Sequence, residues 1–554
     1  MQRKRIGDLL VEAGLLSDER LQEALQEQKE LQMKLGDVLL TRGYISEQQL
    51  IEVLEFQLGI PHVQLFRQKL DPKLISLIPK QTAEQHTVIP IRIEGNRLIV
   101  AMADPLDYFA IDELRMITGL RIVPTIASKD ELNRVIKRYY GLQESIDQIS
   151  ENLALSETEE HILKPDLEEQ SPVVKTVNQI ISQAVELGAS DIHIDPQDDG
   201  LRIRYRIDGM VRTERTMPIH MQSVIVARIK IMANLNVSER RVPQDGRIEM
   251  EINYRKIDIR LSTLPTIYGE KIVMRILDMG SALTEIDRLG MSKRNMDAFK
   301  TGITRPFGVV LITGPTGSGK TTTLYSALSR LNQEEVNIIT IEDPVEYQLL
   351  GINQVQVNPA VGLTFAQGLR AILRQDPNIV MVGEIRDTET AEIAVRAAMT
   401  GHLVLSTLHT NSSVNSLTRL IDMGVEPFLI ASALNTVVGQ RLVRRICTHC
   451  AVPYTPVEEE AQMLSEFGLP NDRLRRGLGC AECAHTGYKG RIAIHEVLAV
   501  DDPLRSMILK RSSDYEYLEY ALKNGLETML QDGLTKAAAG LTSIQEVYRV
   551  TSRY

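Results

Sequence analysis

The sequence predicts an α/β protein in which a parallel sheet holds a phosphate-binding loop. The loop reads GPTGSGKTTT, and residues 314–321 fit the pattern G-x-x-x-x-G-K-[ST]. An apolar run at 307–313 suits a buried strand before the loop, and the run at 323–331 has its apolar residues at helical spacing. Because strand, loop and helix follow in the order that makes this motif specific, we expect the region to bind a nucleoside triphosphate.

The chemistry of the loop gives each kind of residue a task. Glycines let the backbone turn sharply, so that successive N–H groups point at a phosphate, and the next helix adds the partial positive charge of its N-terminus. Lys320 is expected to reach the β- and γ-phosphates, and the Thr321 hydroxyl is expected to ligate Mg²⁺. The residues expected to bind the nucleotide here are Gly314, Pro315, Thr316, Gly317, Ser318, Gly319, Lys320, Thr321 and Thr322.

Three later apolar runs, each suited to a buried strand, carry polar residues at their ends. These residues are Glu342, Asp343 and Glu346 after the first run, Glu384 after the second, and His402 and His409 at the two ends of the third. In an open parallel sheet, ligands bind at the carboxyl ends of the strands. A carboxylate there can hold Mg²⁺ through water or orient the attacking water, and the histidines could sense the γ-phosphate. Solvated strand ends are the alternative interpretation.

Length and charge limit the functions that the chain can have. Its 554 residues correspond to roughly three or four domains. The net charge is −10 and there is no basic tract, which argues against a motor that grips nucleic acid by phosphate charge. No apolar run approaches the ~18 residues that cross a membrane, and the N-terminal sequence is not a signal peptide. We therefore expect a cytoplasmic protein that meets a membrane only through partners.

Changes in composition and periodicity divide the chain into four regions. The predicted division is 1–143 for an N-terminal region (a helical repeat at 1–60 and a small α/β unit at 61–143), 144–170 for an acidic linker, 171–283 for a second α/β domain, and 284–554 for the domain that holds the loop. Strands are expected at 87–93, 97–102, 201–206, 256–262 and 271–277, and helices at 111–118, 129–140 and 174–187.

Four cysteines form two close pairs in an insert at 447–483. Cys447 and Cys450 make the first C-x2-C pair, Cys480 and Cys483 make the second, and 29 residues lie between the pairs. Four thiolates give a closed tetrahedral Zn²⁺ site, which is structural because no ligand position is left open. The gap is expected to contain a helix around 458–467. Disulfides are the alternative, which a reducing cytoplasm disfavours.

Together, the segments GPTGSGKTTT, IEDPVE, VGEIRD and TGHLVLSTLHTN resemble the secretion-superfamily ATPases that drive type II secretion and type IV pilus assembly. The resemblance implies a RecA-like ATPase core. In this family the second segment is the aspartate box, the third is the Walker B segment and the fourth is the histidine box. The resemblance therefore implies that Glu346 polarises water and that Glu384 is the Walker B acid. It also implies that the tetracysteine element belongs to an assembly or secretion motor and not to a retraction motor.

The resemblance extends to the region before the core. Residues 189–194, 202–209 and 241–247 match the family's second N-terminal domain, a PAS-like α/β domain. Arg204 and Arg206 are then candidates to reach a neighbouring active site as arginine fingers, which stabilise charge on the transferred phosphoryl group. Their alternation puts both on one face of a strand, and a solvated strand face is the alternative interpretation.

An internal repeat opens the sequence, and its second copy begins 29 residues after the first. Each copy is interpreted as two short helices broken at a glycine, Gly14 or Gly43, with Ser17 and Ser46 as N-caps. The repeat resembles the tandem motif of cyclic di-GMP-binding domains that some of these ATPases carry, with five residues between the copies. A docking module for a partner protein is the alternative interpretation.

The resemblance implies a set of cyclic di-GMP contacts in the repeat. They are Arg5, Ile6, Gly7 and Gln28 from the first copy and Lys34, Leu35, Gly36 and Gln57 from the second. This sequence departs from the family motif at Ile6, where leucine is usual, and at Tyr44, where an aliphatic residue is usual. It also has Lys34 where arginine is usual, and lysine cannot offer the planar stacking of a guanidinium.

These features favour a cytoplasmic hexameric ATPase that powers assembly of type IV pili under control by cyclic di-GMP. ATP, Mg²⁺ and Zn²⁺ are the expected cofactors, with cyclic di-GMP as an allosteric ligand. The expected partners are five further copies of the chain, an inner-membrane platform protein and cytoplasmic assembly proteins, which place the chain at the inner face of the cytoplasmic membrane without direct nucleic acid. A type II secretion ATPase is the first alternative, followed by a nucleic-acid translocase or a nucleotide-responsive regulator.

Overall fold

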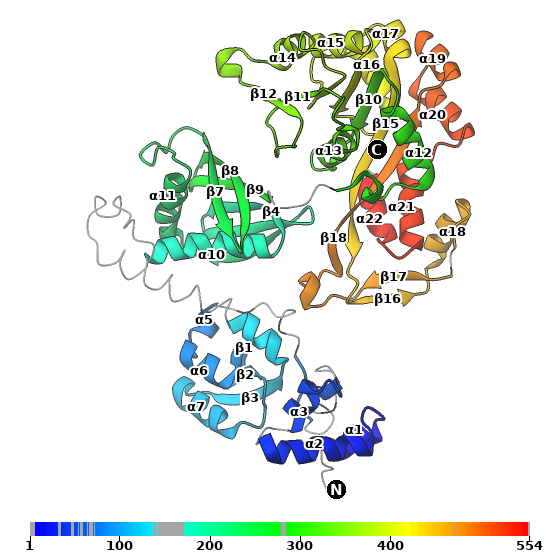
Figure 1. The fold of residues 1–554 in the computed structure, drawn as a ribbon. Helices are drawn as coiled ribbons and strands as arrows, with labels where there is room; N and C mark the ends of the chain where they lie inside the picture. Colours follow the sequence, from blue (N-terminus) through cyan, green and yellow to red (C-terminus); the bar gives the residue numbers. More distant parts are fainter. Residues whose placement is uncertain are drawn as a thin grey trace.

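The computed structural model describes most of the chain and places its strands in four sheets (Figure 1). The described residues are 6–31, 35–45, 49–51, 53, 55, 59–63, 65, 70, 72–136, 140, 171–278, 284–470 and 472–551. Arg5, Lys34, Ser46 and Gln57 and the expected linker at 144–170 lie outside them. Within the described residues, no helix is both long and apolar enough to span a bilayer.

The N-terminal repeat packs as short helices around one small core. The helices are α1 (Ile6–Glu12), α2 (Asp18–Leu31) and α3 (Leu35–Thr41). Leu10 and Leu39, which occupy equivalent positions in the two copies, are both 0% exposed. The breaks expected at Gly14 and Gly43 are confirmed, because their φ angles are +68° and +66°. In this left-handed region a glycine ends a helix without steric strain.

A small three-stranded sheet follows, in the order β1-β2-β3. β1 and β2 are antiparallel, β2 and β3 are parallel, and both expected strands are confirmed. The third strand was not expected, and the helix expected at 111–118 begins earlier because the Asp107 side chain caps it by accepting from the Ala110 N–H. The elements are α5 (Pro72–Ile75), α6 (Lys80–His86), β1 (Val88–Glu94), β2 (Arg97–Met102), α7 (Tyr108–Thr118) and β3 (Arg121–Ile126), and residues 129–136 are helical.

The second unit is an antiparallel sheet in the order β6-β5-β4-β9-β8-β7 with helices on one face. The expected helix and three expected strands are confirmed here. Ile192 and Ile194 of β4 and Ile225 and Ile229 of α11 pack in the core between the sheet and the helices. The elements are α10 (Pro172–Glu186), β4 (Ala189–Gln197), β5 (Gly200–Ile207), β6 (Met210–Met217), η2 (Ile219–Met221), α11 (Gln222–Met232), β7 (Gln244–Ile252), β8 (Arg255–Thr266) and β9 (Gly269–Asp278).

The third unit is built on a seven-stranded sheet in the order β12-β11-β13-β14-β10-β15-β18. All neighbouring pairs are parallel except β15 with β18, so the predicted α/β class with a parallel sheet is confirmed. Separate apolar cores cover its two faces. The elements up to β15 are η3 (Ile286–Arg288), α12 (Lys293–Ile303), β10 (Gly308–Thr313), α13 (Lys320–Leu331), β11 (Ile338–Glu342), β12 (Asn353–Gln356), η4 (Pro359–Val361), α14 (Phe365–Ile372), β13 (Ile379–Val382), α15 (Thr388–Met399), β14 (Leu403–Leu408), α16 (Asn415–Asp422), α17 (Pro427–Ala433) and β15 (Leu434–Ile446).

The cysteine insert and a group of helices complete this unit. The two-stranded sheet of β16 and β17 lies in the insert, and the helix expected around 458–467 is confirmed as α18. The elements are β16 (Ala451–Tyr454), α18 (Glu458–Glu466), β17 (Leu474–Gly477), η5 (Ala481–Cys483), β18 (Tyr488–Ala499), α19 (Asp502–Leu509), α20 (Asp514–Lys523), α21 (Met529–Ala538) and α22 (Ile544–Thr551).

Candidate nucleotide-binding and metal sites

The phosphate loop connects β10 to α13, as the strand–loop–helix pattern predicts. Its glycines at 314, 317 and 319 have φ angles of +150°, +78° and +88°. A Cβ on Gly314 would lie 2.4 Å from the backbone oxygen of Gln440, so only glycine fits at this position. Gly319 is the N-cap of α13, which directs the N-terminus of this helix at the loop.

Lys320, the first residue of α13, folds over the loop that precedes it. Its Nζ donates to the backbone oxygens of Gly314 at 2.8 Å and Pro315 at 3.1 Å. Burial lowers the pKa of Lys320 to about 8, with Arg441 acting in the same direction and Glu384 opposing. A phosphate in the loop would give the ammonium an anionic partner and raise this pKa again.

Gln440 of β15 supports the phosphate loop through two side-chain hydrogen bonds. Its side chain is buried, donates to the Ser318 backbone oxygen at 2.8 Å and accepts from the Thr323 hydroxyl at 2.8 Å. The residue therefore fixes the loop to the beginning of α13. Sequence reasoning missed Gln440, because no local pattern links it to a loop more than a hundred residues earlier in the chain.

Glu384 and His409 meet at the carboxyl edge of the parallel sheet. Glu384 follows β13 and His409 follows β14, and their side chains approach to 3.3 Å between Oε2 and Nε2. The other oxygen of Glu384 forms an ion pair with Arg386 at 2.6 Å. Thr410, the residue after His409, is hydrogen-bonded to Thr313, the residue before the phosphate loop, so these predicted residues lie beside the loop.

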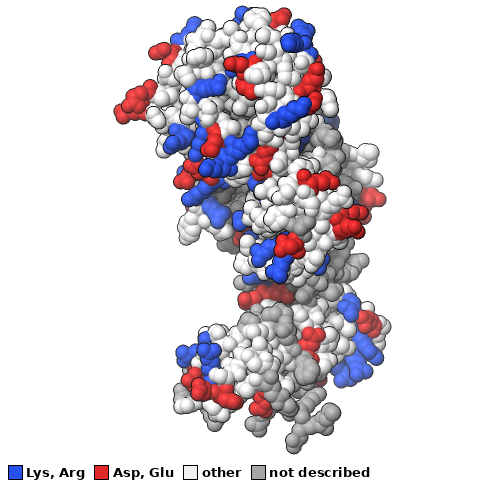
Figure 2. Space-filling model, turned by 90° about the vertical axis from the view of Figure 1, so that its right-hand side faces the viewer, with Lys and Arg blue, Asp and Glu red and all other residues white. Residues whose placement is uncertain are grey.

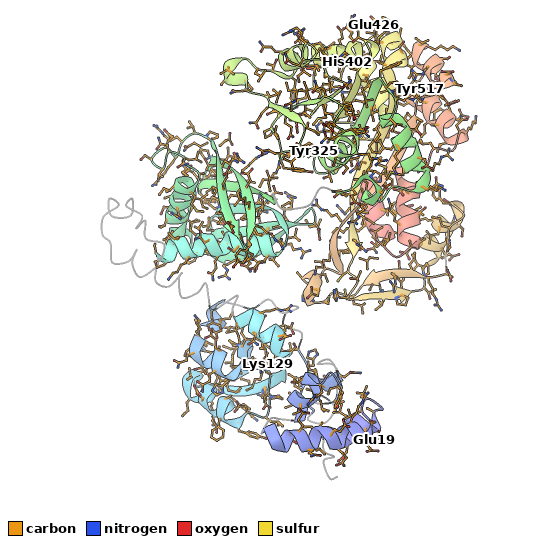
Figure 3. All side chains as sticks on the ribbon, viewed as in Figure 1. Glu19, Lys129, Tyr325, His402, Glu426 and Tyr517 are labelled. Atoms are coloured by element: carbon orange, nitrogen blue, oxygen red, sulfur yellow. The ribbon has the colours of Figure 1, made fainter. Side chains whose placement is uncertain are left out.

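His402 is not part of this group. It precedes β14, and its backbone oxygen accepts from the N–H of Gly308, the first residue of β10. It therefore lies at the amino edge of the sheet, opposite the phosphate loop, and Figure 3 shows it far from Tyr325 of α13. Its ring nitrogen Nδ1 contacts the Ala397 backbone oxygen at 3.0 Å, which ties it to the end of α15.

The two glutamates of the aspartate-box segment have different surroundings. Glu342 ends β11, is 3% exposed and is enclosed by hydrogen-bond donors. Glu346 lies four residues further on and is partly exposed. Its Oε2 is 3.0 Å from a guanidinium nitrogen of Arg260, which is an ion-pair distance although the angle does not fit a hydrogen bond. Of the two, Glu346 is the carboxylate available to a substrate.

The arginines expected from β5 are engaged within their own sheet. Arg204 and Arg206 lie on one face, as predicted, but they pair with Asp195 at 2.5 Å and Asp191 at 3.3 Å. Arg260 of β8, which sequence reasoning missed, reaches the aspartate-box segment. The alternation of residues along a strand could not single out Arg260, because Arg204 and Arg206 of β5 alternate in the same way but form ion pairs within their own sheet.

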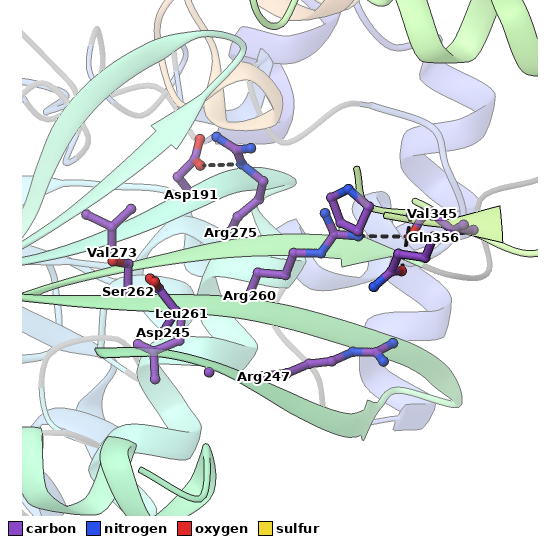
Figure 4. Close-up of a pocket in the computed structure, with 12 residues that line it drawn as sticks. Asp191, Asp245, Arg247, Arg260, Leu261, Ser262, Val273, Arg275, Val345 and Gln356 are labelled. Carbon is purple, nitrogen blue, oxygen red and sulfur yellow. Dashed lines mark hydrogen bonds and ion pairs between the residues drawn. The ribbon is translucent and has the colours of Figure 1, made fainter. Parts of the chain in front are cut away.

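A cleft of about 470 Å³ separates the two units at this point (Figure 4). Arg247, Arg260 and Arg275 line it from the six-stranded sheet, and Pro344 and Val345 line it from the other unit. Arg260 crosses the cleft to donate to the Val345 backbone oxygen at 3.1 Å. The cleft therefore places cationic groups against the segment that carries Glu346.

The four cysteines converge as the spacing predicts. Their sulfurs all lie within 4.8 Å of one another, and three of the Sγ–Sγ distances are 3.7, 3.8 and 3.8 Å. A tetrahedron with Zn–S bonds of about 2.3 Å has edges of about 3.8 Å, so the geometry fits zinc. The backbone N–H groups of Gly479 and Cys480 point at the sulfurs of Cys450 and Cys483, at 3.3 and 3.2 Å. Such donors stabilise thiolates, and the four residues form no disulfide.

In the N-terminal repeat, the predicted ligand glycines contact leucines. A Cβ on Gly7 would lie 2.7 Å from Leu21, and a Cβ on Gly36 would lie 3.2 Å from Leu50, the equivalent residue of the second copy. Helix packing alone therefore explains both glycines. Gln28 lies on α2 and Leu35 begins α3 next to the repeat core.

Tyr44, which departs from the family motif, is held by residues of the first copy. Its hydroxyl donates to Glu23 at 2.8 Å, and the Arg20 guanidinium lies 5.4 Å from its ring centre. Arg42 adds an ion pair with Glu27 at 2.6 Å. These contacts join the two copies across exposed surface, so the tyrosine is accommodated without disturbing the repeat core.

Comparison with known proteins places this geometry in a family. The model of the Type II/IV secretion system protein family matches residues 166–549, and the MshEN domain model matches residues 58–146. The type IV pilus assembly ATPase PilB of Myxococcus xanthus is 43% identical over 98% of this chain and 98% of its own length. The type II secretion system protein E of Xanthomonas campestris is 45% identical over 84% of this chain and 83% of its own.

A solved structure agrees at the level of fold. The ATPase DotB of Yersinia pseudotuberculosis superposes with a TM-score of 0.52 over 68% of this chain and 93% of its own, at 19% identity. The RecA-like core expected from the sequence motifs is thereby confirmed. With a family model that spans both the six-stranded and the seven-stranded sheets, this chain belongs to the Type II/IV secretion system protein family.

Proposed function

We propose that the chain is a cytoplasmic ATPase that powers type IV pilus assembly. One observation carries the proposal: Lys320, Glu384 and His409 come together beside a phosphate loop at the carboxyl edge of a parallel sheet. The pilus assembly ATPase of Myxococcus, which matches over nearly its whole length including the N-terminal region, supports this choice. The type II secretion relative supports the alternative, an ATPase for protein export.

The residues suggest how hydrolysis proceeds. Loop N–H groups and Lys320 would bind the β- and γ-phosphates, and Thr321, in the first turn of α13, would ligate Mg²⁺. When bound, Mg²⁺ supplies positive charge that stabilises the leaving phosphate oxygens. Glu384 would hold Mg²⁺ through bound water, and Glu346 would polarise the attacking water. Arg260, already at 3.0 Å from Glu346, supplies charge to the transition state from the second unit.

A hexamer accounts for the arginines that are not near the loop. Arg204 and Arg206 lie on the charged face of the six-stranded sheet, and ion pairs with Asp195 and Asp191 fix the positions of their side chains. In a closed ring this face can meet an adjacent copy, as the resemblance implies. The expected platform and assembly proteins at the inner membrane remain part of the same proposal.

Surface charge argues against a nucleic-acid translocase. The net charge is −10, and on the face drawn in Figure 2 acidic and basic side chains are interspersed. A protein that tracks a phosphate backbone presents a continuous basic groove instead. Measured turnover with and without DNA separates the two functions.

We propose that cyclic di-GMP regulates the motor through the N-terminal region. The MshEN match at residues 58–146 adjoins the repeat that carries the motif residues. Gly7 and Gly36 serve helix packing, so the polar residues of the motif, and not the glycines, carry the expected affinity. Calorimetry with cyclic di-GMP on the full chain is the test, and Lys34→Arg should tighten binding because arginine stacks on guanine.

ATP turnover by the purified chain tests the main proposal. We expect Mg²⁺-dependent release of phosphate that is lost in Lys320→Ala. Pilus assembly and protein export are then distinguished by deleting the gene and scoring surface pili and secreted enzymes separately. Loss of export with normal pili would replace the pilus function by the secretion function.

A further inference from the structure

A buried hydrogen-bond network joins the helix after the phosphate loop to the segment that carries Glu346. At its centre is the carboxylate of Glu342, the 3%-exposed last residue of β11. This carboxylate accepts from the Thr340 hydroxyl at 2.6 Å and from Gln354 Nε2 at 3.1 Å, and it also accepts from the Tyr325 hydroxyl. Three donors therefore satisfy a group that is costly to bury without partners.

Tyr325 connects this network to Glu346. Its side chain is 0% exposed, and its hydroxyl accepts from the backbone N–H of Glu346 at 3.3 Å while it donates to Glu342. Burial, together with the hydrogen bond to Glu342, raises the pKa of Tyr325 above its usual range, so the hydroxyl keeps the proton that it donates. The Tyr347 ring packs edge-on against it, with centroids 4.6 Å apart.

The position of Tyr325 on its helix gives these contacts a meaning for the reaction. Lys320 begins α13 and Tyr325 lies within the same helix, so one rigid element contacts both the phosphate loop and the Glu346 backbone. The Glu346 carboxylate is held from the other side by Arg260. The main chain and the side chain of Glu346 are thus fixed by two different units.

We propose that Tyr325 is a positioning residue for ATP hydrolysis, holding the backbone of Glu346 at a fixed place relative to the phosphate loop. The inference rests on the proposed role of Glu346 as the carboxylate that polarises water. Without the hydroxyl, the Glu346 N–H and the Glu342 carboxylate each lose a partner, and the Glu346 segment is free to shift. Because a misplacement of about 1 Å can cost up to about 100-fold in rate, turnover suffers while the loop contacts that bind ATP remain.

The test compares two tyrosine hydroxyls in the full-length protein. Tyr325→Phe removes the hydroxyl from the network, and Tyr347→Phe removes one from the adjacent ring, whose hydroxyl makes no hydrogen bond among the described residues. We expect kcat to fall at least about tenfold in Tyr325→Phe, with KM and the Kd of a fluorescent ATP analogue within about twofold of the unmodified protein. In Tyr347→Phe all three constants should stay within about twofold. A merely structural role would instead lower the melting temperature and weaken ATP binding in step with kcat.

Single variants at Glu346 and Lys320, measured beside Tyr325→Phe, separate this inference from the proposed function. Near-normal turnover in Lys320→Ala would overturn the proposed function, whereas full turnover in Glu346→Gln would leave the ATPase standing and overturn the positioning role, because no polarising carboxylate would remain to be positioned. If Glu346→Gln is inactive but Tyr325→Phe keeps its kcat, only the positioning role fails. If Tyr325→Phe does not fold, Glu342→Gln, which weakens the anchor of the tyrosine, should show the same fall in kcat at unchanged KM; an unchanged kcat there would also overturn the inference.

Discussion

The two large sheets of this protein carry their polar groups in different places, one at the ends of its strands and the other on one face. The seven-stranded sheet is covered by apolar cores on both faces, and its predicted ligand-binding residues lie at the carboxyl ends of its strands. The six-stranded sheet packs its helices on one face, and the other carries ion pairs such as those of Arg204 and Arg275. A parallel sheet with helical crossovers buries both faces, whereas an antiparallel sheet can leave one face polar.

This difference between edge and face decides which site residues can be predicted from the order of the strands alone. At an edge, neighbouring parallel strands end side by side, so Glu384 and His409, which follow the neighbouring strands β13 and β14, come into contact. On a face, all alternate residues of all strands are candidates. The arginine that reaches Glu346 proves to be Arg260, while Arg204 and Arg206 pair within their own sheet.

The largest expected effect is at the edge. Lys320→Ala removes the ammonium that contacts phosphate, and Glu384→Gln removes the acid beside it, so hydrolysis should fall at least about 100-fold in each variant. Glu384→Gln should still bind ATP, since the loop is intact. Phosphate release and the binding of a fluorescent ATP analogue are the measurements. Near-normal turnover in Lys320→Ala would refute an active site at this edge.

The next effect compares two arginines on the face. Arg260→Gln should lower kcat about tenfold or more, because it removes the cation that contacts Glu346. The matched variant Arg204→Gln leaves that contact in place, so kcat should fall less than in Arg260→Gln when the chain is not assembled. Steady-state kinetics below and above the concentration at which the chain assembles is the measurement. A larger loss in Arg204→Gln only in the assembled state would assign a role across subunits to β5.

The cysteine site, in the insert that follows β15, provides a separate test. Cys480→Ser should abolish binding of one Zn²⁺ per chain and lower the melting temperature by at least about 5 °C, because metal binding contributes to folding of this lobe. The affinity for ATP should be unchanged. Metal analysis of protein purified without chelator, with calorimetric melting, decides the matter. Metal-free protein with four titratable thiols and an unchanged melting curve would contradict a zinc site.

The smallest expected effect is the uptake of a proton when ATP binds. Burial lowers the pKa of Lys320 to about 8, and bound phosphate should raise it, so ATP binding should take up close to one proton at pH 9 and almost none at pH 6.5. Affinity should therefore decline as the pH rises through about 8. Calorimetry in buffers of different ionisation enthalpy measures the uptake. Lys320→Arg, which stays charged, should abolish it; equal uptake in that variant would assign the proton to another group.

The features that could be predicted from the sequence are local in the chain. The phosphate loop, the strands before Glu346 and Glu384, and the cysteine pairs each depend on residues within a short segment, where periodicity and spacing are informative. Strand direction would also have excluded His402, because a residue before a parallel strand lies at the amino edge. The positions of the glycine breaks in the repeat followed in the same way from their spacing.

The features that could not be predicted are side-chain contacts between distant segments. Gln440 supports a loop over a hundred residues away, and Arg260 reaches a backbone oxygen 85 residues later. Such contacts depend on the register of strands and on how one unit sits against another, which no local pattern encodes. For the same reason Glu342 was grouped with Glu346, although β11 buries the first and leaves the second accessible.

The contact between Arg260 and Glu346 makes the chemistry sensitive to mechanical load. The cation and the carboxylate belong to units with separate apolar cores, and a cleft lies between them. A force that pulls the six-stranded unit away from the other should lengthen this pair and separate the carboxylate from its cation. A nucleotide that binds one arrangement of the two units more tightly favours that arrangement, and a load that imposes the other arrangement should weaken its binding by the same factor. We therefore expect the affinity for ATP to depend on the load that the chain works against.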